Sequence, residues 1–245
     1  MRSTVTSIPV PVRRALRPAV APLVRHAPGR RVRWGSLRRV RPFSRHYGWD
    51  RGDPVDRWYI DGFIARHADA LRGDVLEVRQ PDYARRFSER VSDLHIVDID
   101  PTNRQATLIA DLTDPHSLPE SRYDCAVITQ TLQFLGDVPA ALANLRRALR
   151  PGGTLLVTVP CLGKVDHEAP ASDCWRWMPA GLARLLRDSF PGENVQVEGR
   201  GNVLAGVAFL MGIAQQELRA SDLACEDPSF PLVACGRVDV GDRRR

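Results

Sequence analysis

The chain has 245 residues, of which 43% are hydrophobic, and a formal net charge of +6; this is enough to build one full core, so we expect one domain with tails. No apolar run reaches the 18 residues of a membrane span, and the five cysteines (positions 125, 161, 174, 225 and 235) include no Cys-x-x-Cys pair. The composition therefore argues against a membrane-spanning protein, a disulfide framework and a zinc site, and favours a reducing cytoplasm.

The basic charge is concentrated in residues 1–46, which hold twelve arginines and no aspartate or glutamate. The rest of the chain is therefore net acidic. Six prolines and mutual charge repulsion oppose regular structure in this segment, so we expect a disordered tail. Four interpretations stay open: a solvated tail, a start codon placed too far upstream, a polybasic arm for nucleic acid or anionic lipid, and a mitochondrial-type presequence. The prolines disfavour the presequence, because they oppose an amphipathic helix. The expected domain covers residues 47–238, and residues 239–245 form a second tail.

A helix is predicted after Asp53-Pro54, because an acid at the N-cap followed by proline is typical of a helix start. Gly73 marks the end of this segment. Apolar side chains recur at helical spacing and predict one stripe facing a sheet: Val55, Tyr59, Ile60, Phe63, Ile64, His67 and Leu71.

Three apolar runs that follow each end near a carboxylate. They cover residues 74–78 with Glu77, 95–100 with Asp98, and 107–112 with Asp111. A crossover helix over residues 83–90 fits between the first two. In open α/β sheets, ligands bind outside the carboxyl ends of the strands, and an acid about 20 residues after the first turn reaches a ribose hydroxyl. The pattern thus indicates a nucleoside-containing cofactor.

The second half of the chain continues the alternation of strands and helices. Strands are predicted over residues 123–129, 154–159, 195–198 and 231–235. Helices are predicted after Asp137, near Pro179 and over residues 204–218, and Pro151-Gly152-Gly153 is predicted to break the chain sharply. This order predicts an α/β fold with a doubly wound, mostly parallel seven-stranded sheet and helices on both faces.

Five short motifs occur in an order and at intervals that are typical of one family. They are Leu76-Glu77-Val78, Asp98-Ile99-Asp100-Pro101, Ala110-Asp111-Leu112, residues 123–128 and Leu149-Arg150-Pro151-Gly152-Gly153. Together they resemble the class I S-adenosylmethionine-dependent methyltransferases of the type 11 kind. The resemblance runs from about Tyr47 to Val238 and implies a Rossmann-like fold with S-adenosyl-L-methionine as cofactor.

The resemblance also implies roles for residues at the strand ends. Asp98 matches the acid that binds both ribose hydroxyls, and Ile99 lies where a side chain packs on the adenine. Asp111 matches the acceptor of the adenine amino group, with the Leu112 backbone beside it. The methionine end is implied to lie near Glu77, Val78, Arg79, Thr129 and Gln130.

The chain departs from the family at the turn after the first strand. A glycine-rich turn is expected there, and this sequence reads Arg79-Gln80-Pro81-Asp82. Glycine allows close approach of the backbone to a ligand. Arg79 either points outward, or pairs with the cofactor's carboxylate, or obstructs the pocket.

The main hypothesis is an O-methyltransferase that acts on a small molecule or a glycan. His167, in the loop after the fifth strand, is the candidate general base. Asp166 and Asp173 are candidates to orient it, and His46 is a weaker candidate base. The alternative is a non-catalytic binding protein that keeps the fold. Nucleic-acid modification is disfavoured by the acidic domain, and a nicotinamide enzyme by the missing G-x-G-x-x-G turn.

Overall fold

The computed structural model describes residues 33–241, and the chain divides into two units, residues 1–40 and 41–245. Of the first unit, the structure describes residues 33–40, which include one 3₁₀ turn, η1 (Gly35–Leu37). The second unit begins at Arg41. The backbone N–H groups of Phe43 and Ser44 donate to the Met211 carbonyl at 2.7 and 3.4 Å, which ties this segment to the larger unit.

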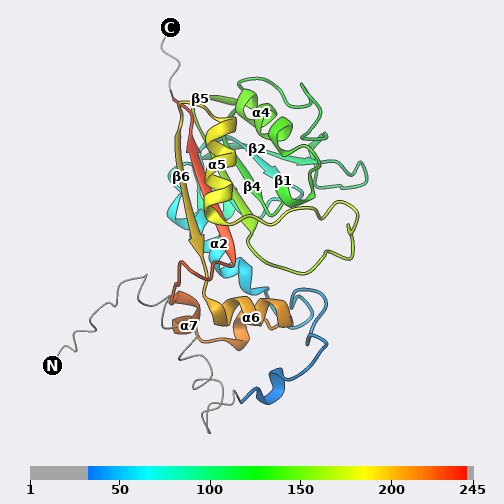
Figure 1. The fold of residues 1–245 in the computed structure, drawn as a ribbon. Coiled ribbons are helices and arrows are strands. Elements are labelled where there is room, and N and C mark those ends of the chain that lie inside the picture. The colour runs from blue at the N-terminus through cyan, green and yellow to red at the C-terminus, as the bar shows by residue number, and fades with distance from the viewer. Residues whose placement is uncertain (1–32, 242–245) are drawn as a thin grey trace, which may run out of the picture. The chain divides into compact units, whose positions relative to one another are not determined.

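The larger unit is built around a seven-stranded sheet with the order β3-β2-β1-β4-β5-β7-β6 (Figure 1). The strands are β1 (Gly73–Val78), β2 (Val91–Asp98), β3 (Leu108–Ile109), β4 (Tyr123–Thr129), β5 (Leu149–Pro160), β6 (Asn194–Arg200) and β7 (Val233–Asp239). The first five pair in parallel, and β7 runs antiparallel to both β5 and β6. The predicted mostly parallel α/β sheet is confirmed.

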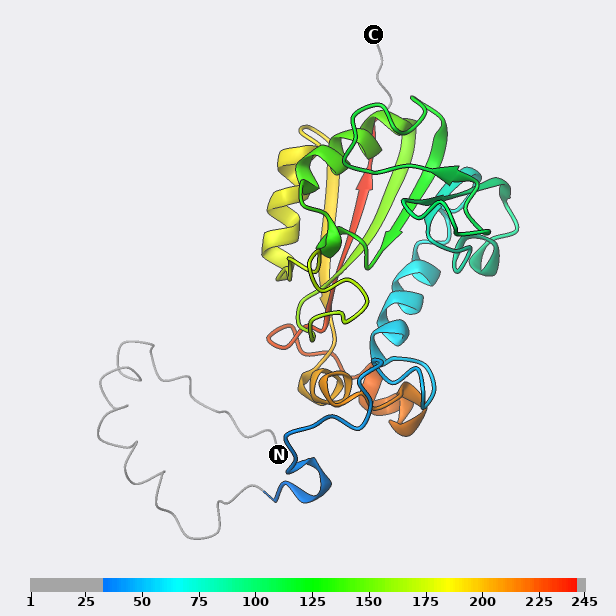
Figure 2. The ribbon, with the colours of Figure 1, turned by 90° about the vertical axis from the view of Figure 1, so that its right-hand side faces the viewer.

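Helices cover both faces of the sheet. On one face, α4 (Val138–Ala148) and α5 (Pro179–Ser189) pack against a core of strand side chains. On the other face lie α2 (Val55–Arg66), the short α3 (Ala84–Phe87) and α6 (Val203–Met211), with α7 (Ala220–Ala224) beside α6. Figure 2 shows α5 in yellow and α2 in cyan on opposite sides of the sheet.

The helix after Asp137 forms as predicted. The Asp137 carboxylate accepts a hydrogen bond from the Ala140 N–H at 2.9 Å, which satisfies one of the free donors at the helix start. Six apolar side chains that recur at helical spacing after Asp137 are all buried: Val138, Ala141, Leu142, Leu145, Ala148 and Leu149. Helical spacing was therefore sufficient to orient this element.

The start of α2 differs in detail from the prediction. The helix begins at Val55, and Pro54 rather than Asp53 is its N-cap. The Asp53 carboxylate instead accepts from the side chains of Gln215 (3.0 Å) and Gln216 (2.6 Å). These glutamines belong to η3 (Gln215–Glu217), so Asp53 ties the helix start to a distant segment.

Two predicted elements near the first strands are shorter than expected. The crossover helix predicted over residues 83–90 is only the single turn α3. The third strand, predicted over residues 107–112, is reduced to Leu108–Ile109, because β3 is an edge strand that pairs only with β2. Edge strands are commonly short, which protects a sheet from pairing with other chains.

Three further boundaries were wrong. The strand β5 begins at Leu149, before the Pro-Gly-Gly turn; the Gly152 N–H donates to the Val240 carbonyl at 2.9 Å, so the turn stays within the sheet. The helix predicted over residues 204–218 ends at Met211, where Gly212 adopts a left-handed φ of 65°. The last strand begins at Val233 instead of Pro231 and continues to Asp239.

The five cysteines differ in how far solvent reaches them. All five are free, and Cys125 and Cys235 are fully buried in β4 and β7. Cys174 and Cys225 are exposed. In residues 33–241, no helix has the length and apolar character needed to cross a membrane, and no group of three potential ligands could hold a metal ion.

Candidate functional site

A cavity of about 700 Å³ lies where the parallel strands of the sheet end. Its walls come from seven segments of the chain: the ends of β1, β2 and β4, the residues after β3, the loop after β5, residues 46–57 and α6. Those used below are His46, Tyr47, Asp56, Arg57, Val78, Arg79, Asp98, Ile99, Asp111, Leu112, Thr129, Gln130, Gln133, Lys164, Asp166, His167, Glu168, Asp173, Arg176 and Phe209. The position agrees with the general rule for ligand sites in open α/β sheets.

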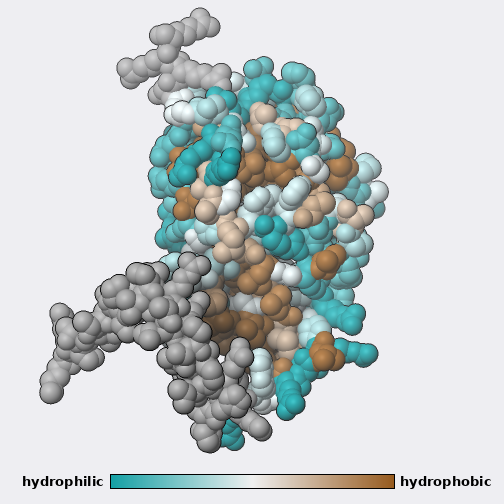
Figure 3. All heavy atoms as spheres, viewed as in Figure 1, coloured by the Kyte–Doolittle hydropathy of each residue, from teal (hydrophilic) through white to brown (hydrophobic). Residues whose placement is uncertain are grey.

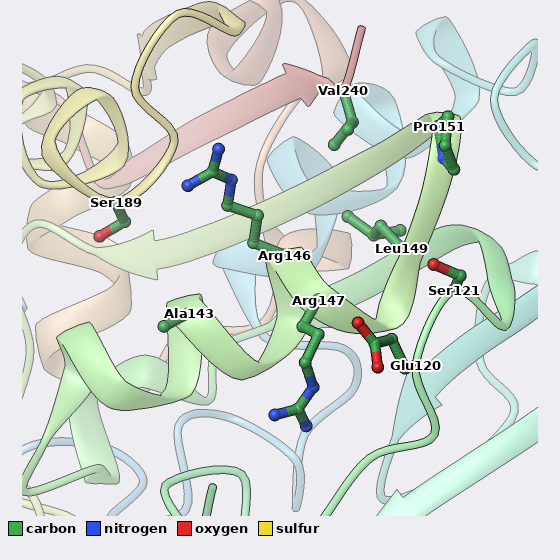
Figure 4. Close-up of a pocket in the computed structure, with 9 residues that line it drawn as sticks. All are labelled: Glu120, Ser121, Ala143, Arg146, Arg147, Leu149, Pro151, Ser189 and Val240. Carbon is green, nitrogen blue, oxygen red and sulfur yellow. The ribbon is translucent and has the colours of Figure 1, made fainter. Parts of the chain in front are cut away.

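A second cavity, of about 350 Å³, lies at the other end of the sheet, beside the starts of β4 and β5 (Figure 4). It is lined by Glu120, Ser121, Ala143, Arg146, Arg147, Leu149, Pro151, Ser189 and Val240. The two arginines extend from α4 in different directions, so they do not converge on one point. None of the carboxylates predicted to bind a cofactor reaches this cavity, and we place the candidate site in the larger one.

Asp98 is held at the end of β2 by a small hydrogen-bond network. Its Oδ2 accepts from the Asn103 side chain at 2.6 Å, and its Oδ1 accepts from the Asp100 N–H at 3.1 Å. The same Asn103 amide donates to the Arg79 carbonyl at 2.7 Å, which joins this loop to the turn after β1. A carboxylate has about four acceptor positions, so Asp98 keeps two for a ligand. The adjacent Ile99 is 66% exposed.

Asp111 lies beyond the end of β3 and is half-buried. Its Oδ1 accepts from both the N–H and the hydroxyl of Thr113, each at 2.8 Å. Because both bonds use the same oxygen, Oδ2 keeps its accepting capacity for a ligand. Leu112 is buried directly after it. The structure thus brings Asp98, Ile99, Asp111 and Leu112 to one side of the cavity.

Arg79 occupies the position where the sequence pattern called for glycine. Its backbone has φ = 70°, the left-handed conformation that glycine adopts at little cost. Its side chain is 74% exposed and points toward Glu168, with 3.9 Å between Arg79 Nη2 and Glu168 Oε2. The turn therefore keeps a glycine-like path without glycine, and the guanidinium lies at the rim of the cavity.

Glu77 is not among the residues that line the cavity. It is 1% exposed and accepts from the backbone N–H groups of Tyr83, at 3.2 Å, and Ala84. Burial raises the pKa of its carboxyl group, and these hydrogen bonds oppose the rise. The geometry gives Glu77 a role in holding the turn from β1 to α3, while its neighbour Val78 reaches the cavity.

The residues after β4 carry unpaired polar atoms toward the cavity. Gln130 has a left-handed φ of 48°, and within residues 33–241 its buried Nε2 has no hydrogen-bond partner. The buried Oε1 of Gln133 also lacks one in that part of the chain. Buried polar groups are normally paired, so unpaired ones in a cavity are typical of a ligand site. Thr129 lines the same wall.

Sequence reasoning missed Asp56, on the first turn of α2. It is 8% exposed and lines the cavity, and its buried Oδ1 has no partner among the described residues. Burial raises the pKa of this carboxyl group, which the neighbouring Arg57 partly offsets. A signal was available, because position 56 lies one helical turn before Ile60 on the predicted apolar stripe. An acid on a buried stripe indicates a functional role.

Arg57 was also missed, and it connects α2 to the turn after β1. Its guanidinium donates to the Tyr83 hydroxyl at 2.7 Å. Tyr83 directly follows Asp82 in the turn after β1, and its N–H donates to the Glu77 carboxylate. This side of the cavity therefore contains one cation next to one buried acid.

The loop after β5 brings two histidines together. The rings of His46 and His167 meet edge to face, with centroids 4.9 Å apart, and both line the cavity. Asp166 Oδ1 lies 3.8 Å from His167 Nδ1. Asp173 does not reach His167: it pairs with Arg176 at 2.5 Å and accepts from the Asp166 N–H at 2.8 Å. Asp173 thus holds the loop, and its pKa is lowered by the hydrogen bond from Arg176.

Lys164, the only lysine of the chain, lies on the same wall. Its ammonium is 3.7 Å from the centroid of the Tyr47 ring, a cation–π contact. Burial lowers the pKa of Lys164 and raises that of Tyr47. Neither residue was singled out from the sequence, because neither belongs to a motif.

Residues 66–157 match the family model of the methyltransferase domain. This part of the chain is therefore similar to a methyltransferase domain. No curated protein matches the chain.

Solved methyltransferases share the fold of this domain. An S-adenosylmethionine-dependent methyltransferase from Archaeoglobus fulgidus gives a TM-score of 0.51 at 13% identity, over 75% of this chain and 94% of that one. One from Mesorhizobium loti gives 0.50 at 16%, over 76% and 99%. The Haloferax volcanii protein solved with the Trm112 methyltransferase activator gives 0.50 at 18%, over 77% and 98%.

S-adenosylmethionine is the cofactor of this class of domain, and the residues present fit it. A diol and an exocyclic amine need acceptors, and Asp98 and Asp111 both line this cavity with accepting positions to spare. The amino-acid end carries an ammonium and a carboxylate. Within residues 33–241, Asp56 Oδ1 and Gln130 Nε2 have no hydrogen-bond partner, and both residues line the same cavity. They are an acceptor and a donor of the kinds that an ammonium and a carboxylate need.

Proposed function

We propose that this methyltransferase domain transfers a methyl group to an oxygen of a small-molecule or glycan acceptor. The observation that carries the proposal is a single cavity that holds both the acid pair Asp98 and Asp111 and the histidine pair His46 and His167. A cofactor end and an acceptor end within one enclosure are what a two-substrate transfer requires, because the enzyme's main task is to position the reacting groups.

We assign cofactor binding to four cavity residues near the carboxyl ends of the strands: Asp56, Asp98, Asp111 and Gln130. When bound, S-adenosylmethionine supplies a methyl group on a sulfonium, which is already an activated leaving group. Asp98 would accept from the ribose hydroxyls, and Asp111 Oδ2 would accept from the adenine amino group. Asp56 Oδ1 would hold the ammonium, and Gln130 Nε2 would donate to the carboxylate.

At the acceptor end, His167 removes the proton from the reacting hydroxyl group. A carboxylate beside Nδ1 favours the tautomer with the proton on that nitrogen, which leaves Nε2 free to accept a proton. Asp166 is in position to have this effect, at 3.8 Å. His46, in edge contact with His167, excludes water from one side of the ring. General-base catalysis of this kind typically contributes about 10²- to 10⁴-fold in rate.

Cofactor binding is tested first, because it needs no acceptor. The melting temperature of the full chain is measured with and without S-adenosylmethionine or S-adenosylhomocysteine. A ligand at 100 times its Kd stabilises a protein by about 2.7 kcal/mol, so a clear upward shift is expected. Asp98→Ala and Asp111→Ala should abolish the shift. Asp100→Ala is the control, since Asp100 is exposed and does not line the cavity. No shift at millimolar ligand contradicts the proposal.

The acceptor is then sought by methyl transfer from labelled cofactor to a panel of hydroxylated small molecules and glycans. With an acceptor in hand, His167→Ala should reduce kcat by about 10²- to 10⁴-fold and leave the cofactor-induced thermal shift unchanged. A loss of the thermal shift in this variant would mean that His167 supports the fold of the site and is not the base.

The second candidate function is that of a non-catalytic binding protein, and Arg79 is the observation that favours it. A large side chain stands where the family pattern has glycine. Under this alternative the native chain binds no S-adenosylmethionine, and Arg79→Gly restores binding. The exposed position of the guanidinium at the rim supports the enzyme instead.

A further inference from the structure

The side chain of Gln133 is held in one orientation at the wall of the large cavity. Gln133 belongs to η2 (Leu132–Phe134), just after β4, and it is 5% exposed and lines the cavity. Its Nε2 donates to the Gln130 carbonyl at 2.8 Å. A carbonyl only accepts, so this bond fixes which end of the Gln133 amide is the oxygen.

The Oε1 atom of Gln133 is buried and has no hydrogen-bond partner within residues 33–241. A buried acceptor without a partner destabilises a fold, and such atoms in a cavity are typical of a ligand site. The proposed cofactor contacts use Asp56, Asp98, Asp111 and Gln130 and leave this oxygen unused. It therefore remains for the second substrate.

A donor on the same cavity wall is also unused. Arg57 Nη1 donates to the Tyr83 hydroxyl at 2.7 Å, but the buried Arg57 Nε has no partner among the described residues. After the cofactor contacts are assigned, the cavity thus keeps one buried acceptor, on Gln133, and one buried donor, on Arg57.

Gln133 is also linked to the loop that carries the proposed base. Its backbone carbonyl accepts from the N–H groups of Cys174, at 2.9 Å, and Trp175, at 3.3 Å. Asp173, the residue before Cys174, accepts from the N–H of Asp166, the residue before His167, at 2.8 Å. This chain of hydrogen bonds joins Gln133 to the His167 segment, so we assign Oε1 to the acceptor end of the cavity.

Aromatic side chains supply an apolar part of the cavity wall. Tyr47 stacks on Phe209 with ring centroids 5.5 Å apart, and Trp49, which is 55% exposed, lines the same cavity. Phe209 belongs to α6, and Figure 3 shows hydrophobic residues gathered over this helix. Ligand pockets typically combine such apolar walls with a few fixed polar atoms that provide specificity.

We propose that the methyl acceptor is a small polyhydroxylated molecule of the sugar class, and that Gln133 determines specificity by accepting from a hydroxyl other than the one methylated. This inference rests on the proposed methyl transfer. A hydroxyl both donates and accepts, so hydroxyls of one molecule can satisfy Gln133 Oε1 and Arg57 Nε. A monohydroxyl acceptor has its only donor engaged by His167 and leaves Gln133 Oε1 unpaired.

The transfer itself involves a different hydroxyl of the same molecule. Its oxygen bonds to the methyl carbon as the bond from that carbon to sulfur breaks, and His167 takes its proton. The products are a methyl ether and S-adenosylhomocysteine. A site that hydrogen-bonds a substrate hydroxyl rejects the analogue without it by about 10⁴- to 10⁵-fold, so the contact to Gln133 should dominate acceptor choice.

The test measures methyl transfer from labelled S-adenosylmethionine to acceptors that differ by one hydroxyl. The acceptors are the methyl glycosides of glucose, mannose and galactose, their monodeoxy analogues, and the monohydroxyl compounds cyclohexanol and phenol. For the best glycoside, removal of one non-reacting hydroxyl should lower kcat/KM at least 100-fold in the wild-type chain. In Gln133→Met, which keeps the length of the side chain and removes its acceptor, the same comparison should differ less than tenfold.

The matched control is Gln105→Met, because Gln105 is exposed and does not line the cavity. It should discriminate between glycoside and deoxy analogue like the wild-type chain. The thermal shift with S-adenosylhomocysteine should be equal in all three proteins, since Gln133 acts on the acceptor. The acceptor series in the wild-type chain needs no variant, so it decides the outcome even if Gln133→Met does not fold.

Four outcomes would overturn this inference while the wild-type chain still shows the cofactor-induced shift. They are transfer to cyclohexanol or phenol as efficient as to the best glycoside, no transfer to any glycoside, unchanged discrimination in Gln133→Met, and loss of the cofactor-induced shift in Gln133→Met. The last would place Oε1 at the cofactor. A wild-type chain without the shift contradicts the proposed function itself, so the two failures are distinguishable.

Discussion

At the scale of single residues, the turn after β1 shows how a backbone path can be kept when its usual residue is absent. Arg79 holds φ = 70° although it carries a Cβ, and this conformation costs an ordinary residue about 1–2 kcal/mol. Two hydrogen bonds hold the backbone in this conformation. The Arg79 N–H donates to the Val97 carbonyl at 2.9 Å, and the Arg79 carbonyl accepts from the Asn103 side chain at 2.7 Å. The cavity wall is therefore preserved at the expense of stability.

Arg79→Gly should raise the free energy of unfolding by about 0.5–1 kcal/mol, since relief of the strained φ exceeds the added entropy of the unfolded chain. Cofactor affinity should change little, because the guanidinium is at the rim. Urea denaturation and calorimetric titration measure the two quantities. His116→Gly is the control: its φ is 71°, and it does not line the cavity. A large gain in affinity for Arg79→Gly would show that arginine obstructs the site.

Asp56 predicts a pH-dependent stability. Burial raises the pKa of its carboxyl group in the folded state, so the fold favours the protonated form. Ionisation of Asp56 therefore lowers the free energy of unfolding. This loss is absent below the unfolded-state pKa of about 4 and is complete above the folded-state pKa. Asp56→Asn should therefore melt at a higher temperature than the wild type at pH 7, and the difference should disappear toward pH 4.

The same variant should lose affinity for S-adenosylmethionine, since an uncharged amide pairs less well with an ammonium. Thermal melts between pH 4 and 8, with and without ligand, measure both effects. A variant that is less stable than the wild type at pH 7 would contradict the assignment of Asp56 as a buried, ligand-directed acid.

At the scale of elements, α6 is ended by a glycine that has no space for a side chain. Gly212 has φ = 65°, and an added Cβ would lie 2.2 Å from the backbone oxygen of Ser44. The Ile213 N–H donates to the Ala208 carbonyl at 2.9 Å, which caps the helix. Gly212 thus ends the helix and also allows the backbone at Ser44 to pack closely against the helix end.

Gly212→Ala should lower the free energy of unfolding by about 3 kcal/mol, from backbone strain and from overpacking. Gly192→Ala tests the strain alone, since Gly192 has φ = 83° and open space around it; it should cost about 1 kcal/mol. Chemical denaturation of both variants separates the two terms. Equal costs would mean that the segment around Ser44 moves away easily.

Helices and strands were predicted correctly where the periodicity of apolar residues determines the structure. Their lengths were predicted wrongly where contacts with other segments determine where an element ends. The stripe of α4 and the five parallel strands followed from spacing alone. The lengths of β3 and α3 could not be predicted in this way, because they depend on the position at a sheet edge and on the Glu77 carboxylate that accepts from the turn.

At the scale of the whole molecule, the sequence predicted which strand ends line the large cavity better than it predicted the other residues of the cavity wall. Asp98 and Asp111 belong to strand ends, which topology brings to one edge. Asp56, Lys164 and Tyr47 come from segments that contact the cavity only through tertiary packing. No motif marks such residues, and only the three-dimensional fold brings them to the carboxyl ends of the strands.

The cysteines give this chain built-in reporters of its own motions. Cys125 and Cys235 are fully buried, and burial raises the pKa of both thiols, so they react with alkylating reagents only when the sheet opens. Cys174 is exposed on the loop, and its N–H donates to the carbonyl of Gln133, a cavity residue, at 2.9 Å. Alkylation rates followed by mass spectrometry would thus separate loop movement from global unfolding in the unlabelled, unmutated protein.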